Sequence, residues 1–259
     1  MKKLLDVMAA LRHPDSGCPW DIKQSLKSII PYTLEEAYEV ADAIEQGDMQ
    51  ALKSELGDLL FQVVFYAQIA KEQGEFEFSD VVDTVSDKLI RRHPHVFANA
   101  QYADDTSLNE AWEQAKAAER DEESDVEKAS ILGGVAMALP ALKRAQKLQK
   151  RAARVGFDWP GIEPVFAKIE EEIQELREAM QQKDKAFVYE EMGDVLFSCV
   201  NLSRHLGVDS EESLRSCNQK FERRFTHIEE TLETRQQSFE SRSLDQLEKL
   251  WQDAKLAGK

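Results

Sequence analysis

Residues 171–175 read Glu-Glu-Ile-Gln-Glu, and residues 191–194 read Glu-Met-Gly-Asp. Two earlier segments match them, Glu-Glu-Ala-Tyr-Glu at 35–39 and Glu-Leu-Gly-Asp at 55–58, and every matched position is offset by 136 residues. Apolar residues that follow the second motif match at the same offset. Self-similarity at one fixed offset indicates two copies of a single structural unit.

The segments that carry these motifs have the periodicity of amphipathic helices, and no strand pattern interrupts them. One broad apolar stripe consists of Leu52, Leu56, Leu59, Leu60, Val63, Val64 and Ala67. Thr33 with Glu36 predicts a capping box at a helix start. Asp48 and Asp184 are predicted N-caps, and Pro164 suits the first turn of a helix. The four acids of each copy are therefore expected on two consecutive helices.

Segments that flank the motifs repeat as well, so the whole module is duplicated. We predict an N-terminal helical module at 1–120, a linker at 121–139 and a C-terminal helical module at 140–259. The linker is charged at its start and contains the helix-breaking pair Gly133-Gly134. Short connections such as Gln46-Gly47-Asp48 favour antiparallel neighbours, so we expect an all-α protein of two tandem helical bundles.

The overall charge restricts the class of partner. The chain has 49 acidic and 33 basic residues, for a formal net charge of −16. Nucleic-acid binders need clustered Lys and Arg to displace the counterions of the phosphate backbone, so we expect no nucleic-acid partner. A small phosphorylated substrate fits if bound cations offset the acidic field around it.

The cysteines and the hydropathy pattern bear on location. Cys18, Cys199 and Cys217 are widely spaced and odd in number, which argues against a disulfide framework and favours a reducing compartment. No segment is apolar enough to cross a bilayer, and the first residues do not read as a targeting segment. We expect a cytoplasmic protein with no membrane partner.

Within each copy the acids fall into two pairs. Residues three apart share a helix face, so Glu172 and Glu175 project together. The same holds for Glu191 and Asp194 on the next helix. Four carboxylates that meet in one cleft repel one another unless divalent cations neutralise them, and hard oxygen ligands suit Mg²⁺, with Mn²⁺ as a substitute. The first copy offers the same set: Glu36, Glu39, Glu55 and Asp58.

A solvated helix face and a di-iron centre fit the acids less well than a Mg²⁺ site. A solvated face is the usual fate of glutamate in an acidic protein, but here both pairs recur with identical separation. Gly57 and Gly193 precede the aspartates at a cost of roughly 1 kcal/mol each in a helix interior, which predicts close approach by another group. A di-iron centre would need histidine in place of Asp58 or Asp194.

With these motifs the chain resembles the MazG family of nucleoside triphosphate pyrophosphohydrolases, within a wider all-α group whose signature is Glu-Glu-x-x-Glu followed by Glu-x-x-Asp. The resemblance extends to Gly17–Trp20, Arg91–His95 and Lys220–Phe225, and it is to the tandem, two-module members. It implies Mg²⁺-dependent hydrolysis between the α- and β-phosphates of nucleoside triphosphates such as ATP, with broad specificity, to a nucleoside monophosphate and pyrophosphate. It also implies a homodimer.

The family pattern, carried over to this sequence, makes these residues of the second module the metal ligands: Glu172, Glu175, Glu191 and Asp194. Bound metal would neutralise charge that develops on the phosphates and would lower the pKa of the attacking water. Glu171 or Glu172 would orient or deprotonate that water, and the sequence leaves the choice open.

Cationic residues of the second module are candidates for phosphate binding. Lys168 precedes Glu172 by one helical turn and shares its face, where an ammonium group would contact phosphate. Lys220, Arg223 and Arg224 form a compact basic patch in an otherwise acidic protein. Surface salt bridges would account for any single member of the patch, but together they suit a triphosphate clamp.

Two further positions are candidates for nucleoside binding. Trp251 would stack on the base unless it is a core residue, and Asn201 would hydrogen-bond to the substrate. At the offset of 136, Tyr32 replaces Lys168 and Phe65 replaces Asn201, so we expect the C-terminal module to be the main catalyst. The expected nucleotide contacts are Lys168, Glu171, Glu190, Asn201, Lys220, Arg223, Arg224 and Trp251.

Two alternatives remain open at this point. One is a non-enzymatic helical interaction or regulatory module whose acidic clefts hold structural Mg²⁺. The other is a pyrophosphohydrolase of narrow specificity, for dUTP or phosphoribosyl-ATP. A panel of nucleotides assayed for pyrophosphate release separates all three.

Overall fold

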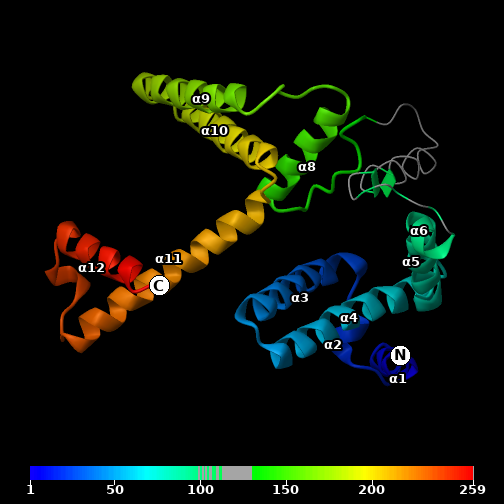
Figure 1. Ribbon diagram of the computed structural model, residues 1–259. Coiled ribbons are helices and arrows are strands. Elements are labelled where there is room, and N and C mark those ends of the chain that lie inside the picture. Colours follow the sequence, from blue (N-terminus) through cyan, green and yellow to red (C-terminus); the bar gives the residue numbers. More distant parts are fainter. Residues whose placement is uncertain are drawn as a thin grey trace. The chain divides into compact units, whose positions relative to one another are not determined.

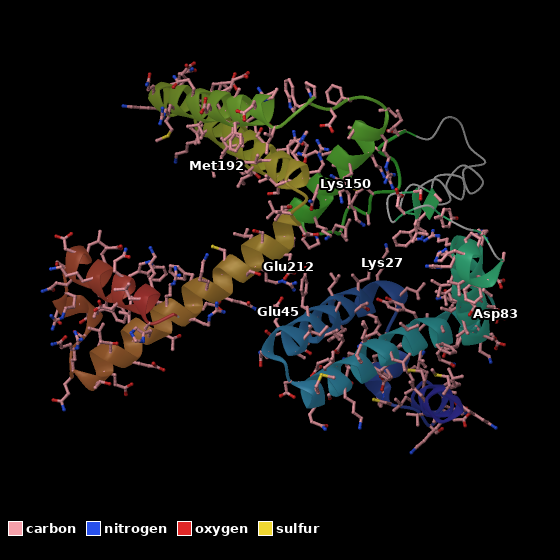
Figure 2. The ribbon with its side chains drawn as sticks, in the orientation of Figure 1. Lys27, Glu45, Asp83, Lys150, Met192 and Glu212 are labelled. Carbon is pink, nitrogen blue, oxygen red and sulfur yellow. The ribbon has the colours of Figure 1, made fainter. Side chains whose placement is uncertain are left out.

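A computed structural model describes residues 1–98, 100, 102, 104, 107–108, 111–112 and 130–258. The chain divides into two compact units, Met1–Asp125 and Val126–Lys259, which we describe separately. Every regular element in these described ranges is a helix, as the sequence predicted (Figure 1). The side chains that surround the helices of each unit are drawn in Figure 2.

The first unit is organised around a hairpin of two long helices. Its described helices are α1 (Lys2–Leu11), α2 (Pro19–Ile22), α3 (Leu26–Gln46), α4 (Met49–Glu72), α5 (Phe78–Arg92) and α6 (Pro94–Phe97). Helix α3 packs along α4, and α1 packs on α4. The hairpin turns at Gly47, whose φ of 70° suits a residue without a Cβ. The core of the unit consists of Met8, Ile29, Val64, Phe65 and Ile69.

The second unit repeats the hairpin. Its described helices are α8 (Ala141–Arg154), α9 (Glu163–Gln182), α10 (Lys185–His205), α11 (Ser210–Thr234) and α12 (Leu244–Leu256), with a short 3-10 turn η1 (Phe239–Ser241) before α12. Helix α9 packs along α10, and α8 packs on α10. Helix α11 runs away from this group, and α12 folds back on its far half (Figure 1). That contact has its own small core of Ile228, Leu232 and Leu250.

Three of the predicted helix signals are confirmed. Asp48 caps α4, because its carboxylate accepts hydrogen bonds from the backbone N–H groups of Gln50 and Ala51. Asp184 caps α10 in the same way. Pro164 lies in the first turn of α9. The two hairpins therefore start their second helices with the same local device, which fixes where the acids of each motif fall along the helix.

The predicted capping box at Thr33 is wrong. Helix α3 begins seven positions earlier, at Leu26, where Ser25 and Ser28 form the capping box. Thr33 lies inside the helix, and its hydroxyl bonds to the carbonyl of Ile29 and to the hydroxyl of Tyr66, 2.8 Å away. The Thr-x-x-Glu spacing therefore does not mark a helix start here. Thr33 lies in the interior of a longer helix and contacts Tyr66 on α4.

The predicted module limits at 1–120, 121–139 and 140–259 stay predictions, because residues 113–129 lie outside the described part of the chain. Within that part, Gly134 has a φ of 71° and α8 begins directly after Pro140. Among the described residues, no helix is long and apolar enough to cross a membrane.

Candidate metal centre

Three acids of the second unit converge between two helices. Glu172 and Glu175 lie on α9 and Glu191 lies on α10, and each offers a carboxylate oxygen within 4.8 Å of the others. Asp194 is not part of this group of three. Its charge nevertheless raises the pKa of Glu191, and it lines a pocket together with Glu172. The predicted quartet is thus a close trio with the fourth acid beside it.

The trio is short of positive charge. Glu172 and Glu191 are only 6% and 8% exposed. Loss of hydration raises the pKa of Glu191, and the charges of Asp194, Glu172 and Glu190 add to this effect. A hydrogen bond to Glu172 raises the pKa of Glu175, and loss of hydration adds to this effect. A cation placed among these oxygens would relieve both the repulsion and the loss of hydration.

Lys168 supplies part of the missing charge. Its ammonium group lies 2.8 Å from Glu171 Oε1 and 2.8 Å from Glu172 Oε1. These hydrogen bonds, to Glu171 first and then Glu172, raise the pKa of Lys168. Lys168, which the sequence predicted to bind phosphate, is therefore held at the edge of the acid trio. It also restrains Glu171, the exposed candidate for the catalytic base.

A pocket of about 540 Å³ lies beside the trio, between α8, α10, the start of α9 and the loop before it. Glu172, Asp194 and Lys168 line one side of the pocket. Three exposed aromatic rings also line it: Phe157, Trp159 and Phe197. The predicted residue Asn201 is a lining residue as well. Acids, a cation, aromatic faces and an amide thus share one cavity, which is the composition of a site for a ligand with a charged and an aromatic end.

A polar network that the sequence analysis missed orients Asn201. The guanidinium of Arg204 donates to Asn201 Oδ1 from Nε at 3.1 Å and from Nη2 at 2.8 Å. Arg204 is in turn ion-paired with Asp158, which His205 also contacts at 3.1 Å. The hydrogen bond from Arg204 holds the pKa of Asp158 below its usual range. Because Arg204 occupies the carbonyl of Asn201, the amide N–H₂ is left as its donor group.

The missed residues had only a weak signal in the sequence. Asp158 lies within the Phe-Asp-Trp segment that follows Gly156, which corresponds to the segment Gly17–Trp20 of the first unit. Nothing in that local pattern indicates a partner 46 residues away on α10.

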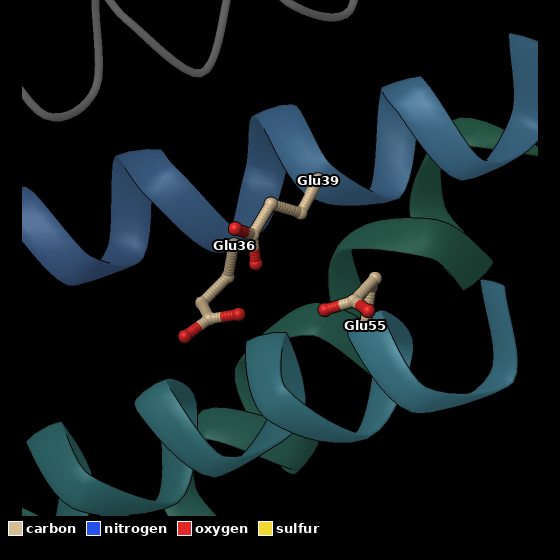
Figure 3. A group of neighbouring side chains, drawn as sticks. All are labelled: Glu36, Glu39 and Glu55. Carbon is tan, nitrogen blue, oxygen red and sulfur yellow. The ribbon is translucent and has the colours of Figure 1, made fainter. Parts of the chain in front are cut away.

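The first unit has the corresponding trio. Glu36 and Glu39 project from α3 toward Glu55 on α4, and their carboxylate oxygens also lie within 4.8 Å of one another (Figure 3). Loss of hydration raises the pKa of Glu36, and the charge of Asp58 adds to this effect. Gln62 Nε2 donates to Glu36 Oε1 at 3.5 Å. Both units therefore repeat the acids, but no lysine takes the place of Lys168.

Two positions that line the pocket in the second unit carry aromatic residues in the first. Phe65 stands where the second unit has Asn201, and it is fully buried in the core with Arg12 over its ring at 5.4 Å. Tyr32 stands in place of Lys168 and packs edge-on against Trp20, with ring centroids 5.7 Å apart. Hence the acids are duplicated, whereas their polar surroundings are not.

The predicted basic patch lies elsewhere in the second unit. Lys220 and Arg223 line an open groove of about 620 Å³ along α11, and neither lines the pocket of the acid trio. Arg224 lies over the ring of Trp251 at 5.5 Å, and Phe221 packs against the same ring. The basic patch and Trp251 thus lie close to one another on α11 and α12. None of these residues lines the pocket beside the acid trio.

Gly57 and Gly193 lie in helix interiors, where a glycine is costly, and the sequence predicted that another group approaches each of them closely. A Cβ atom built on Gly57 or Gly193 would meet no atom of the described residues within 4 Å. No described residue makes the expected close approach, so approach by another group stays a prediction. Both positions face open space beside the acids.

Comparison with known proteins gives one consistent family. The model of the MazG nucleotide pyrophosphohydrolase domain matches twice, at residues 24–97 and 161–229. A nucleoside triphosphate pyrophosphohydrolase of Escherichia coli (strain K12) is 49% identical over 255 residues, which are 98% of this chain and 96% of that protein. The nucleoside triphosphate pyrophosphohydrolase/pyrophosphatase MazG of Thermotoga maritima is 44% identical over 255 residues, 98% of this chain and 95% of its own. The two matched segments carry the two acid trios.

Proposed function

Because this chain belongs to the MazG nucleotide pyrophosphohydrolase family, it is a nucleoside triphosphate pyrophosphohydrolase, and we propose that its second unit carries the activity with Mg²⁺ at the acid trio. The observation that carries this proposal is the position of Glu172, Glu175 and Glu191 beside a pocket that also presents Lys168. The first unit, which keeps its own trio but lacks the polar surroundings, would contribute little to turnover. The alternative of a non-enzymatic module is set aside by the family membership.

The donor set fits Mg²⁺. All three close ligands are carboxylates, and Glu172 and Glu191 are almost fully buried. The raised pKa values of Glu175 and Glu191 mark a deficit of positive charge at the site. Hard oxygen donors of this kind suit Mg²⁺, and Mn²⁺ would substitute. When bound, the metal supplies charge neutralisation at the phosphate oxygens and a lower pKa for a coordinated water.

The residues around the trio supply the remaining steps. A bound triphosphate offers Lys168 a stronger anionic partner than Glu171, so the lysine is expected to turn toward phosphate. Glu171 is then free to accept the proton of the attacking water. Oxygen from that water bonds to the α-phosphorus, the bond to the bridging oxygen of the β-phosphate breaks, and pyrophosphate leaves with the electron pair.

The pocket offers a place for the nucleoside. Trp159 and Phe157 expose their rings to it and would stack on the base. The amide N–H₂ of Asn201, held in place by Arg204, would donate to an acceptor on the sugar or base. Stacking accepts any base, so we propose broad specificity for ribo- and deoxynucleoside triphosphates, including ATP.

The test is pyrophosphate release across a panel that includes the four ribonucleotides, the four deoxynucleotides, dUTP and phosphoribosyl-ATP. We expect turnover of most nucleotides with Mg²⁺ or Mn²⁺ and none with excess chelator. Turnover of dUTP or phosphoribosyl-ATP alone would replace the broad proposal by the narrow one. Activity that survives complete removal of divalent ions would refute the role of the trio.

The two units are compared by matched substitutions. Glu172→Gln should reduce the rate of pyrophosphate release by at least 100-fold, because it removes a ligand charge from the trio of the second unit. Glu36→Gln makes the same change in the first unit and should leave most of the activity. Equal losses from both variants would show that the first unit is an equal catalyst.

A homodimer and a cytoplasmic location are further parts of the proposal. Both long hairpins expose large apolar side chains, such as Tyr38 on α3 and Met192 on α10, which a second copy would cover. The three cysteines are unpaired, which is consistent with a reducing compartment. Light scattering of the purified protein tests the first point, and cell fractionation tests the second.

A further inference from the structure

A buried glutamine on α8 lines the pocket beside the acid trio. Gln149 is only 8% exposed and is one of the residues that form the pocket wall. Its Nε2 donates to the backbone carbonyl of Phe197 on α10 at 2.9 Å. A carbonyl oxygen only accepts hydrogen bonds, so this contact fixes which end of the Gln149 amide is nitrogen and which is oxygen.

The oxygen of the same amide lacks a partner. Gln149 Oε1 is buried and forms no hydrogen bond with any residue that the structure describes. Buried polar atoms are nearly always hydrogen-bonded, because an unmade bond in the interior costs free energy. A few precisely placed polar groups in an otherwise apolar pocket are what orients a ligand. The leftover acceptor in this wall therefore indicates a ligand that brings a donor.

Asn201 offers the complementary group on α10. Its Oδ1 accepts from Arg204, so its N–H₂ is left as the donor group. The pocket thus presents one oriented acceptor and one oriented donor. Phe197 and Asn201 follow Asp194 by three and seven residues, or about 4.5 and 10 Å along the helix axis. With the phosphates at the acids, both amides lie at the level of the nucleoside.

The first unit keeps the helix packing without these amides. Helix α1 packs on α4 as α8 packs on α10. The segment Gly17–Trp20 matches Gly156–Trp159 at an offset of 139 residues, which places Ala10 of α1 opposite Gln149. Phe65 takes the place of Asn201. The hairpin therefore packs without the acceptor and the donor, and both belong to the unit that has the pocket.

We propose that Gln149 Oε1 accepts a hydrogen bond from an N–H group on the Watson–Crick edge of the base, while Asn201 donates to the acceptor next to it. Every natural base carries an N–H beside a carbonyl oxygen or a ring nitrogen on that edge. A stacked base can slide in its own plane, so one acceptor and one donor suit all natural bases. A base without an N–H on that edge is rejected, because it leaves Oε1 unpaired.

Contact with the base requires a small shift of the pocket wall, since Oε1 is covered by the side chains around it. Phe157 has room for such a shift, because its ring is 82% exposed and follows Gly156, whose φ is 84°. The inference rests on the proposed function and adds a rule for its substrates: the second unit selects the hydrogen-bonding edge of the base, not its size.

Matched nucleotide pairs test the proposal. Purine riboside triphosphate is ATP without the 6-amino group, and pyrimidin-2-one riboside triphosphate is CTP without the 4-amino group, so neither analogue has an N–H on the base. For the wild type, kcat/KM should be about tenfold or more lower for each analogue than for its parent. Gln149→Leu removes the acceptor. Its kcat/KM for ATP and CTP should fall about tenfold, and the ratio of parent to analogue should come within roughly threefold of one.

Three results would overturn the proposal. One is a wild type that turns over each analogue as well as its parent. Another is a Gln149→Leu variant that keeps the wild-type ratio for both pairs, because another residue would then read the base. The third is a changed ratio of ATP to dATP in Gln149→Leu with an unchanged ratio for the purine pair, which would make a sugar hydroxyl the donor.

Gln146 provides a matched control on the same helix. It is buried one turn earlier, and its Nε2 donates to the carbonyl of Val208 at 2.7 Å. Its Oε1 accepts from the backbone N–H of Ser210, and it does not line the pocket. Gln146→Leu should therefore keep the wild-type ratios for both pairs, whatever its effect on stability. Loss of these ratios in Gln146→Leu would contradict a specific role for Gln149.

Folding defects and failure of the proposed function are recognised separately. Circular dichroism checks that each variant folds, and Gln149→Met takes the place of Gln149→Leu if the latter does not. A wild type that releases no pyrophosphate from any nucleotide would refute the proposed function. Release from ATP and CTP without discrimination against the analogues would refute only the role of Gln149.

Discussion

Replacement of Lys168 should destabilise the metal-free protein more than the metal-bound protein. The ammonium group of Lys168 makes two charge-assisted contacts of 2.8 Å, one of them to the buried carboxylate of Glu172. Removal of one partner from a fully buried ion pair costs roughly 3–5 kcal/mol. Lys168 is 34% exposed, so solvent screens part of this interaction, and we expect about 2 kcal/mol for Lys168→Met.

A bound divalent ion would take over the neutralisation of Glu172. We therefore expect the stability deficit of Lys168→Met to fall below about 1 kcal/mol at saturating Mg²⁺, while kcat/KM stays reduced at least tenfold, the equivalent of about 1.4 kcal/mol in the transition state. Urea unfolding with chelator and with Mg²⁺, followed by circular dichroism, measures the first effect. Pyrophosphate release measures the second.

Lys185→Met is the matched control, because it removes an exposed lysine from the first turn of α10. Its stability and its activity should change little. A deficit for Lys168→Met that is the same with and without Mg²⁺ would refute the reasoning, since the lysine and the metal would then act on different groups. So would a deficit near zero in chelator.

Three further predictions follow from the pocket, its polar network and the core. Asn201→Phe, which installs the residue of the first unit, should fill the nucleoside pocket and raise KM for ATP at least tenfold with little change in stability; an unchanged KM would remove Asn201 from the site. Asp158 has a pKa held below its usual 3.8 by Arg204, so its contribution to stability is full above pH 3.8 and is lost as the pH falls toward the lower folded-state value. Acid unfolding of Asp158→Asn should be less steep in this range than that of the wild type, and identical curves would contradict the ion pair. Phe65→Asn should cost about 3–5 kcal/mol in urea unfolding, because it leaves a cavity and an amide in the core of the first unit, and a loss below about 1 kcal/mol would show that the site is not tightly packed.

The helices and the acid trios could be predicted from the sequence because both depend on local spacing. Apolar residues at helical spacing and the caps at Asp48 and Asp184 fix where each helix lies along the chain. A three-residue separation then fixes which acids share a face. The short turns between the helices force the two faces together, which is why Glu172, Glu175 and Glu191 converge as expected.

Local spacing misled at Thr33 and did not identify what approaches Gly193. Thr33 has the sequence pattern of a capping residue, but it lies inside a longer helix and its hydroxyl hydrogen-bonds to that of Tyr66. Gly193 has the cost that usually accompanies close packing, yet no described residue approaches it. In both cases the same local pattern is compatible with several tertiary surroundings.

The sequence by itself determined the helical class, the duplication and the acids that face each other in each hairpin. Only the tertiary structure decided which residues surround those acids: the link from Arg204 through Asp158 to Asn201, the burial of Phe65 in the first unit, and the direction in which α11 carries Arg223 away from the trio. The physical reason is the range of the interactions. Helix periodicity acts over three or four residues, whereas these contacts depend on how whole helices pack, and no spacing along the chain encodes that packing.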